Sequence, residues 1–226
     1  MKRKGRDLIL TFLIFFFLLT AFSLERVQAA EFGFRQLRDG DRGTDVGILQ
    51  LKLQWLGLYE DNIDGIFGSI TQSAVREFQR QKGLNPDGIV GPKTYSQLPE
   101  LEELLKDLDQ QQVVYLAQTI TGEARGENFK GQVAVGAVVI NRKNDLRFPD
   151  NIRDIVLEEG QFTSVQDGQI NIYYTDSALK AAQLALLGYD PTNGALFFYN
   201  PSIATELRWI TTREVLARIG KHIFAY

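Results

Sequence analysis

Apolar side chains recur at helical spacing along most of this chain. An amphipathic helix places apolar residues three or four positions apart, and a glycine commonly follows its last turn. The stripes with this spacing are Val46, Leu49, Leu53 and Leu56; Ala74, Val75 and Phe78; and Val113, Leu116, Ala117 and Ile120. Two further helices are expected over residues 94–98 and over the small-residue segment 129–141. The pattern therefore predicts a mainly helical protein.

One apolar stretch near the C-terminus is typical of a strand. Residues 196–199 are apolar and aromatic, and Asn200-Pro201 follows them, as when a strand enters a turn. Such a turn would let Asn200 face a cleft. The fold class that we expect is multidomain: a small all-α domain of three helices, then an α+β, mainly helical domain with a short sheet.

The first 29 residues are typical of a secretory signal peptide. Four basic side chains lie among the first six residues, and residues 8–22 are almost continuously apolar. The sequence that ends at Ala29 fits a cleavage site of small residues. An uncleaved anchor is the alternative, although the apolar run is shorter than the ~20 residues that a membrane span usually needs. In both cases we expect the rest of the chain to lie outside the cytoplasmic membrane.

A short motif occurs twice between residues 60 and 100. Its first copy consists of Asp64, Gly65, Ile66, Gly68 and Thr71. The second copy, 23 positions later, consists of Asp87, Gly88, Ile89, Gly91 and Thr94. Each Asp-Gly pair favours a tight turn with glycine in the left-handed region, and each threonine can cap the helix that follows. The repeat therefore predicts two turn-and-helix units in one small domain.

Residues 37–98 resemble the peptidoglycan-binding domain found on many wall hydrolases. The resemblance is carried by GTDVGILQLKLQWLGLY and by DGIFGSITQSAVREFQRQKGLNPDGIVGPKTYSQL. It implies a compact three-helix domain that binds glycan or stem peptide in a shallow groove, with Asp64, Phe67 and Gln79 as candidate contacts. The alternative is that the repeat serves folding alone. Residues 99–112, rich in Glu, Leu, Asp and Gln, are expected to form a helical linker.

The composition narrows the chemistry that the second domain can perform. The chain has no cysteine and one histidine, His222, so thiol nucleophiles are excluded and a catalytic zinc site is disfavoured. The first 29 residues carry five basic and two acidic side chains, so the net charge of −3 becomes −6 without them. An acidic protein is a poor partner for nucleic acid. Carboxylate chemistry without a cofactor or metal remains, and it suits glycosidic bonds.

Glu123 is the carboxylate that the pattern singles out. It lies in TGEARGE, residues 121–127, between a helix predicted over 112–120 and the small-residue helix over 129–141. Gly136 and nearby alanines would let the second helix approach another element closely. A glutamate desolvated at such a helix end keeps its proton, as a general acid must before it protonates a glycosidic oxygen. A helix cap or a salt bridge is the alternative role.

Residues 113–226 resemble the catalytic domain of the spore cortex-lytic enzyme family. The stretches that carry the resemblance are AQTITGEARGENFKGQVAVGAVVINRKNDLRFPDNIRDIV, QFTSVQDGQI, GYDPTNGALFFYNP and RIGKHIFAY. It implies that Glu123 is the catalytic acid in cleavage between N-acetylmuramic acid and N-acetylglucosamine, in the spore cortex during germination. It also implies lytic transglycosylation, which leaves a 1,6-anhydromuramyl end. One carboxylate is enough for that reaction; Glu127 and Asp167 are the candidates for a second.

A polar segment over residues 161–169 supplies most of the candidate substrate contacts. Its amides and hydroxyls can bond sugar hydroxyl and acetamido groups, and aromatic rings can stack on sugar faces. The candidates are Phe162, Ser164, Asp167, Gln169, Tyr199 and Asn200. Core packing is the alternative for Phe162, and we expect a structural role for His222.

We therefore expect an exported, monomeric enzyme that acts on peptidoglycan and does not bind nucleic acid. Its expected place is the spore cortex, the inner spore membrane or the cell exterior, with a regulatory partner protein in the spore. Two alternatives stay open at this point. One is a hydrolytic muramidase or glucosaminidase of the vegetative wall, and the other is a wall-binding protein without activity.

Overall fold

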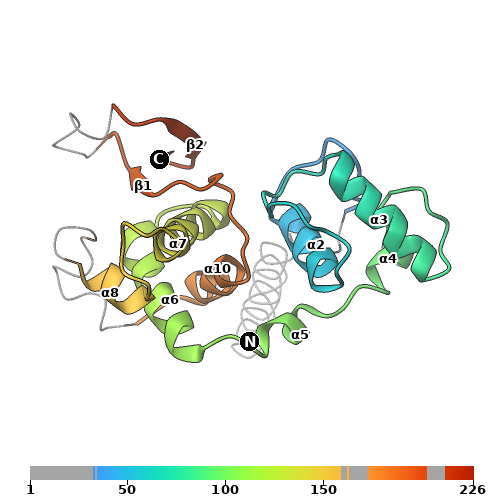
Figure 1. Ribbon diagram of the computed structural model, residues 1–226, viewed down its shortest axis with the longest axis horizontal. Coiled ribbons are helices and arrows are strands. Elements are labelled where there is room, and N and C mark those ends of the chain that lie inside the picture. Colours follow the sequence, from blue (N-terminus) through green and yellow to red (C-terminus); the bar gives the residue numbers. More distant parts are fainter. Residues whose placement is uncertain (1–32, 34, 159–161, 163–172, 203–211) are drawn as a thin grey trace, which may run out of the picture.

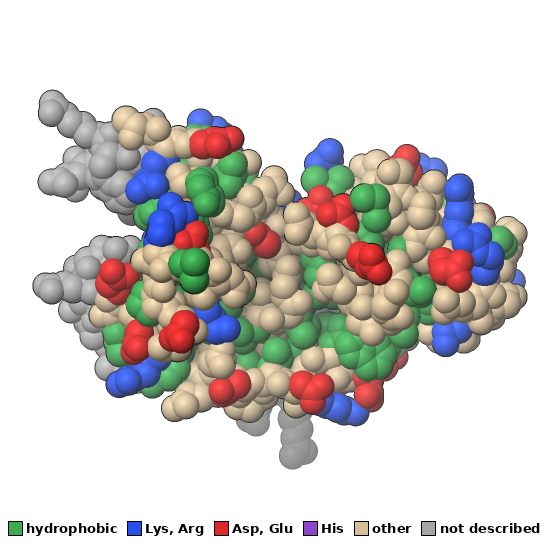
Figure 2. Space-filling model, in the orientation of Figure 1, with side chains coloured by type: hydrophobic (Ala, Val, Ile, Leu, Met, Phe, Trp, Pro, Cys, Tyr) green, Lys and Arg blue, Asp and Glu red, His purple; other side chains and the backbone are tan. Residues whose placement is uncertain are grey.

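The computed structural model describes residues 33, 35–158, 162, 173–202 and 212–226, which fold into two lobes (Figure 1). The predicted signal peptide lies outside these residues. Each helix within them is too short or too polar to span a bilayer. The lobes meet along one side and leave a notch at one edge of the molecule (Figure 2).

The first lobe is the three-helix domain that the sequence predicts. Its helices are α2 (Thr44–Trp55), α3 (Ser69–Gln81) and the short α4 (Pro92–Tyr95). The predicted apolar stripes of α2 and α3 face a common core, with Leu53 and Val75 both at 0% exposure. The helices are short, so most of their stability comes from this packing rather than from helix propensity.

One buried glutamine holds the first of the two repeated turns. Gln50, on α2, donates from Nε2 to Asp64 Oδ1 and to the Ile66 carbonyl, both at 3.0 Å. Its Oε1 accepts the Gly65 N–H at 2.9 Å. Gly65 has a φ of 73°, a conformation that a side chain would strain, so the turn requires glycine there.

The second turn repeats this arrangement with a glutamine from α3. Gln79 Nε2 donates to Asp87 Oδ1 and to the Ile89 carbonyl, and its Oε1 accepts the Gly88 N–H, all at 2.9 Å. Gln79 is 2% exposed and Phe67 is 0% exposed. Two of the three expected peptidoglycan contacts, Gln79 and Phe67, are therefore wrong, because these side chains are committed to the interior of the domain. Asp64 is partly exposed, although its Oδ1 accepts from Gln50.

The segment between the lobes is partly helical. It contains α5 (Leu101–Leu105), whose Leu104 is buried. Asp109 then caps α6 (Gln110–Ala124) by accepting the Gln111 N–H at 2.8 Å. The helix continues one turn beyond the predicted 112–120, because Gly122 costs only about 1 kcal/mol in a helix that tertiary packing supports.

The second lobe is built on α6, α7 (Phe129–Lys143) and α10 (Asp176–Leu186), with α8 (Ile152–Leu157) beside α6 and α7. At Gly136 the three large helices pack closely together. A Cβ on Gly136 would lie 2.9 Å from Ile120 of α6 and 3.1 Å from Ala185 of α10. The close packing expected at Gly136 is therefore confirmed, and it fixes the frame that carries Glu123.

A three-stranded antiparallel sheet completes this lobe. Its strands are β1 (Phe197–Tyr199), β2 (Val215–Ile219) and β3 (His222–Ala225), in the order β1-β3-β2. The central strand β3 is buried along its length. The sheet thereby brings the C-terminal residues of the chain next to the α6–α7 connection, and β1 confirms the strand predicted over 196–199.

Candidate active site

Glu123 lies in the last turn of α6, directly before the loop 125–128 that leads into α7. The residue as a whole is partly exposed. The backbone is held firmly, because α6 packs against α7, α8 and α10. A carboxyl group that is fixed in place and still reachable from solvent meets the geometric requirement for donating a proton to a bound substrate.

Glu127 lies only four residues further on but is buried. Its side chain is 5% exposed. Its Oε2 accepts the Lys221 N–H at 3.0 Å, across 94 residues of sequence. A Cβ on Gly220 would overlap this carboxylate, so the glycine at the β2–β3 turn makes room for Glu127. Glu127 therefore ties the C-terminal hairpin to the α6–α7 loop.

His222 completes this buried cluster. Its side chain is 9% exposed, and its Nδ1 lies 3.6 Å from Glu127 Oε1. The ring meets Phe198 edge-on, with 5.4 Å between centroids. Burial lowers the pKa of His222 below its usual 6.5, while the negative charges of Glu127 and Glu123 oppose that shift. A neutral, packed ring agrees with the expected structural role, although its place beside two glutamates was not predicted.

Two tyrosines near Glu123 were missed by the sequence analysis. Tyr173 is 51% exposed and Tyr174 is 38% exposed, directly before α10. The Arg125 guanidinium, two residues after Glu123, lies 5.4 Å from the centre of the Tyr173 ring. Exposed aromatic rings beside a candidate acid can stack on sugar faces. The signal available in the sequence was an aromatic pair in an otherwise polar stretch.

The other predicted substrate contacts have different outcomes. Phe162 is 1% exposed and lies 6.4 Å from Phe198 between ring centroids. It belongs to the core, so the predicted sugar contact is wrong and the core-packing alternative holds. Tyr199 is half-buried on β1, and the Asn200 Oδ1 accepts the Ser202 N–H at 3.0 Å in the following turn. Ser164, Asp167 and Gln169 lie outside the described residues.

Phe162 packs against a buried cation. The guanidinium of Arg142 lies 5.2–5.4 Å from the ring centres of Phe148, Phe162 and Phe197. Its Nε donates to the Leu196 carbonyl at 2.7 Å. Burial lowers the pKa of Arg142 to about 10, which leaves it charged at neutral pH. The aromatic faces stabilise this charge, and the cluster joins α7 to β1.

The described part of the chain contains no group of three or more histidine, aspartate and glutamate side chains placed to hold a metal ion. The chemistry that this arrangement supports is proton transfer by one accessible carboxyl group, with a second carboxylate close by that is bonded to the hairpin.

Comparison with known domain families matches both lobes. The family model described as Cell Wall Hydrolase matches residues 126–225. A family model for a peptidoglycan binding domain matches residues 42–98. Both families concern the bacterial cell wall, in agreement with the expected order of a binding domain and a catalytic domain.

Individual proteins are similar over nearly the whole chain. A spore cortex-lytic enzyme of Bacillus cereus is 33% identical, over 96% of this chain and 95% of the relative. That of Bacillus subtilis is 31% identical, over 99% of both chains. Among solved structures, the catalytic domain of the germination-specific lytic transglycosylase SleB from Bacillus anthracis is 41% identical. It covers 54% of this chain and 98% of its own, with a TM-score of 0.51.

Proposed function

The chain belongs to the spore cortex-lytic enzyme family, and we propose that it cleaves cortex peptidoglycan during germination, with Glu123 as the catalytic acid. It is a peptidoglycan glycosidase that works as a lytic transglycosylase on the bond between N-acetylmuramic acid and N-acetylglucosamine. The function is supported by relatives named as spore cortex-lytic enzymes and by the similarity of the second lobe to a germination-specific lytic transglycosylase.

The observation that carries the assignment of Glu123 is the commitment of its neighbour Glu127 to the C-terminal hairpin. Both residues are partly exposed, but the Glu127 side chain is only 5% exposed and accepts the Lys221 N–H. One reachable carboxyl group is insufficient for ordinary glycoside hydrolysis, which uses a pair of carboxyl groups. It is sufficient for transglycosylation, because the nucleophile is a hydroxyl group of the substrate itself.

The reaction balances with Glu123 alone. The protonated carboxyl group of Glu123 donates its proton to the glycosidic oxygen as the bond from that oxygen to the anomeric carbon breaks. The 6-hydroxyl of the muramic acid then attacks the anomeric carbon, and the Glu123 carboxylate takes the hydroxyl proton. The products are a 1,6-anhydromuramyl end and a free hydroxyl on the leaving sugar, and Glu123 returns to its starting state.

Neighbouring parts of the molecule supply the binding. Tyr173 and Tyr174 offer exposed rings for stacking on sugars, and Tyr173 lies against Arg125, two residues after Glu123. The peptidoglycan-binding lobe keeps the enzyme on its insoluble substrate and so raises the local concentration of glycan at the second lobe. Tyr199, Asn200, Ser164, Asp167 and Gln169 stay proposed contacts.

The proposal includes the place and partners of the enzyme. The first 29 residues have the composition of an export signal, which would deliver the protein across the cytoplasmic membrane to the cortex, the inner spore membrane or the exterior. Peptidoglycan is the substrate. A monomeric state and a regulatory partner protein in the spore belong to the same proposal.

The test is the variant Glu123→Gln, compared with Glu214→Gln at an exposed carboxylate of the same lobe. Loss of a general acid typically costs about 10²–10⁴-fold in rate, and we expect that loss for Glu123→Gln only. Mass spectrometry of fragments released from cortex and from vegetative sacculi measures both rate and product. Anhydromuramyl ends support transglycosylation, whereas reducing ends would indicate a hydrolytic muramidase or glucosaminidase. Cortex lysis by a folded Glu123→Gln variant would refute the assignment.

A further inference from the structure

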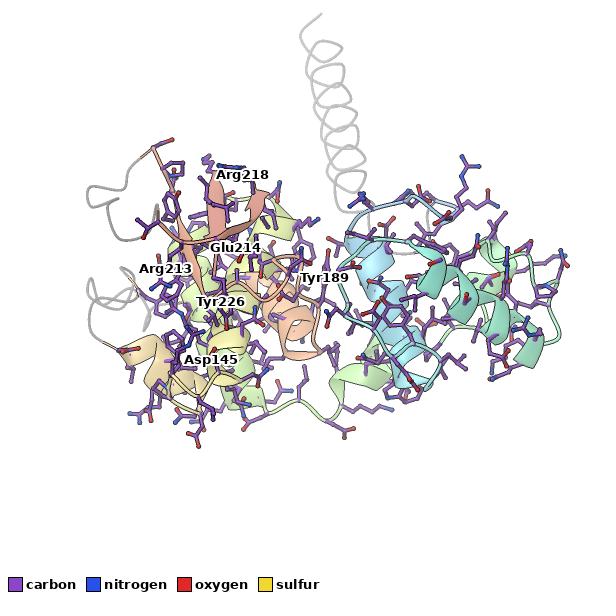
Figure 3. The ribbon with its side chains drawn as sticks, turned by 45° about the horizontal axis from the view of Figure 1, so that its top comes forward. Asp145, Tyr189, Arg213, Glu214, Arg218 and Tyr226 are labelled. Atoms are coloured by element: carbon purple, nitrogen blue, oxygen red, sulfur yellow. The ribbon has the colours of Figure 1, made fainter. Side chains whose placement is uncertain are left out.

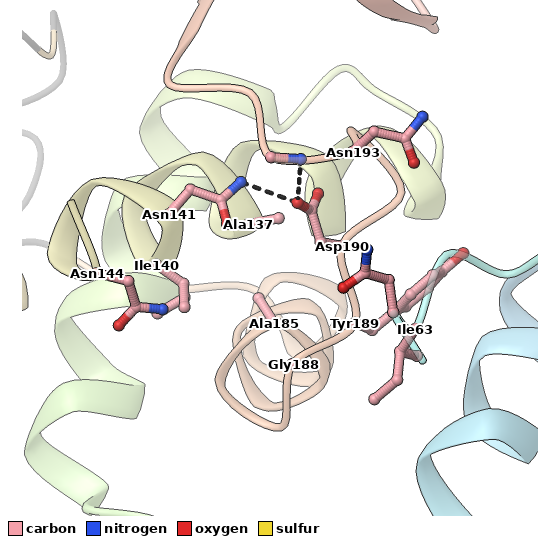
Figure 4. A pocket seen from close by; sticks show the side chains of 12 residues that line it. Ile63, Ala137, Ile140, Asn141, Asn144, Ala185, Gly188, Tyr189, Asp190 and Asn193 are labelled. Carbon is pink, nitrogen blue, oxygen red and sulfur yellow. Dashed lines mark hydrogen bonds between the residues drawn. The ribbon is translucent and has the colours of Figure 1, made fainter. Parts of the chain in front are cut away.

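A cavity of about 280 Å³ lies between the two lobes (Figure 4). The first lobe contributes Asn62 and Ile63, from the connection between α2 and α3. The second lobe contributes the C-terminal half of α7, the end of α10 and the loop 188–194. The cavity therefore exists only where the lobes meet.

Tyr189, which lines this cavity, joins the second lobe to the first. It is 0% exposed and lies between the lobes (Figure 3). A Cβ on Gly47 would lie 2.8 Å from its ring, and one on Gly65 would lie 2.7 Å from its hydroxyl. Next to it, the Asp190 N–H donates to the Ile63 carbonyl at 2.9 Å. The two glycines of the first lobe thus form a socket that only a side chain from the second lobe fills.

The loop 188–194, which forms one wall of the cavity, is held in shape by the carboxylate of Asp190. Asp190 Oδ1 accepts the N–H and the hydroxyl of Thr192 at 2.7 and 2.6 Å. Asp190 Oδ2 accepts from Asn141 Nδ2 at 2.9 Å and from the Gly194 N–H at 2.7 Å. Because donors surround both oxygens, the carboxylate is already satisfied and does not demand a cation. The wall is rigid.

Three asparagine side chains that line the cavity form no hydrogen bond within the described residues. Within the described residues, the side-chain amides of Asn62, Asn144 and Asn193 have no hydrogen bond partner, and all three residues are exposed. Asn193 adopts a φ of 59°, which turns the chain sharply at the cavity. Each amide offers two N–H donors and one oxygen acceptor. Together they offer a ligand uncharged groups that can both donate and accept hydrogen bonds.

The rest of the lining is apolar and small. Ile63, Ala137, Ile140 and Ala185 contribute aliphatic surface. An apolar floor with amides around it suits a neutral ligand that has both a methyl group and several hydroxyl or amide groups. The volume is close to the lower end of the roughly 300–1,000 Å³ of small-molecule sites, so the cavity takes a single ring rather than a strand.

The cavity is separate from the candidate active site. Asn141 lies twelve residues after Phe129, the first residue of α7, which corresponds to about 18 Å at ~1.5 Å per residue. Glu123 precedes that first residue, so the two sites lie toward opposite ends of α7.

We propose that the cavity between the lobes is a second glycan site, which binds one N-acetylated amino sugar of the peptidoglycan strand. The acetamido methyl group packs on the aliphatic floor, and the hydroxyl and amide groups bond Asn62, Asn144 and Asn193. The proposal rests on the proposed function, because it takes peptidoglycan as the substrate. Occupation of this site would hold one part of a strand while another part reaches Glu123.

The test uses the full-length chain with Glu123→Gln, so that the ligand is not consumed. N-acetylglucosamine trisaccharide is titrated while the side-chain amide signals of asparagine are followed by NMR. We expect signals of Asn144 and Asn193 to shift, and the combined change Asn144→Ala with Asn193→Gly to weaken that binding at least about tenfold. Glycine tolerates the positive φ at position 193. Asn85→Ala, an exposed asparagine of the first lobe, is the matched control.

Two results would overturn the proposal. One is unchanged binding of the trisaccharide to the combined variant, and the other is binding of a free stem tetrapeptide, but not of the sugar, in the cavity. Cleavage of cortex by the chain with Glu123 intact is measured separately. A failure of the proposed function would appear there, and a failure of the cavity proposal would appear only in the titration.

Discussion

At the scale of single residues, identical side chains acquire different roles from their surroundings. Glu123 and Glu127 lie in the same short motif and both residues are partly exposed, yet the Glu127 side chain is only 5% exposed, accepts the Lys221 N–H and lies 3.6 Å from His222. A buried carboxylate needs such partners, because an uncompensated charge in the interior is costly. The burial of Glu127 removes it as an accessible second carboxylate and leaves Glu123 as the proton donor that we propose.

His222 makes stability depend on pH. Its pKa in the folded chain is lowered from 6.5, mainly by burial, so the unfolded chain binds more protons in the window between the two values. The free energy of unfolding is therefore highest above pH 6.5 and falls as the pH decreases toward the lowered pKa of the folded state. Urea denaturation of the full chain at several pH values through this window measures the effect.

The control for this prediction is His222→Gln, which has no titratable group at the position. We expect its free energy of unfolding to change less with pH than that of the wild-type chain across the same window. Equal pH dependence in the two proteins would mean that His222 does not titrate as described. Because other carboxylates titrate in both proteins, only the difference between them is informative.

At the scale of elements, one buried glutamine holds each turn of the internal repeat. We call such a glutamine, with its bonds to the turn, a clamp. Gln50 and Gln79 bond their turns through equivalent atoms, and neither side chain is more than 2% exposed. These bonds explain how the buried backbone N–H and C=O groups of the turns find partners in a domain with one four-residue helix and few strands. The two glutamine side chains thus stabilise the fold of the domain.

The first clamp can be tested by Gln50→Ala. The change leaves the buried Gly65 N–H without its partner, whereas the Ile66 carbonyl still accepts the Gly68 N–H at 3.0 Å. An unpaired buried donor costs about 1–3 kcal/mol, so we expect a loss of that size in the free energy of unfolding. Gln54→Ala on the exposed face of α2 is the control and should cost less than about 0.5 kcal/mol. Similar denaturation midpoints for the two variants would contradict the clamp.

At the scale of the whole molecule, specific side chains form the contact between the two lobes. Tyr189 fills the socket at Gly47 and Gly65. Charges of the two lobes also lie close together: burial lowers the pKa of Lys130 on α7, Arg42 of the first lobe adds to that shift, and Asp64 opposes it. The two lobes therefore contact each other directly, in addition to being joined by the linker.

Removal of the tyrosine should release this arrangement. For Tyr189→Ala we expect a larger radius of gyration in small-angle X-ray scattering and faster proteolysis within residues 99–109. Trp55→Ala, at an aromatic side chain that is 55% exposed, should change neither measurement. A scattering curve for Tyr189→Ala that matches the wild-type curve would show that other contacts hold the lobes together.

The sequence alone determined the features that depend on local order along the chain. Apolar spacing located α2, α3, α6 and α7, the run 196–199 located β1, and the repeated Asp-Gly pairs located two turns with glycine at positive φ. The motifs around Glu123 were sufficient for the family and hence for the function. These properties are predictable because helices, turns and motifs depend on a few consecutive residues.

Only the tertiary structure decided what each side chain meets. The bond between Lys221 and Glu127 spans 94 residues, and the contact of Asp190 with Ile63 joins different lobes. Phe162 could equally have faced a sugar or the core until its burial was known. Such pairings leave no local signal, because burial depends on how whole helices and lobes pack, and packing is a property of surfaces far apart in the sequence.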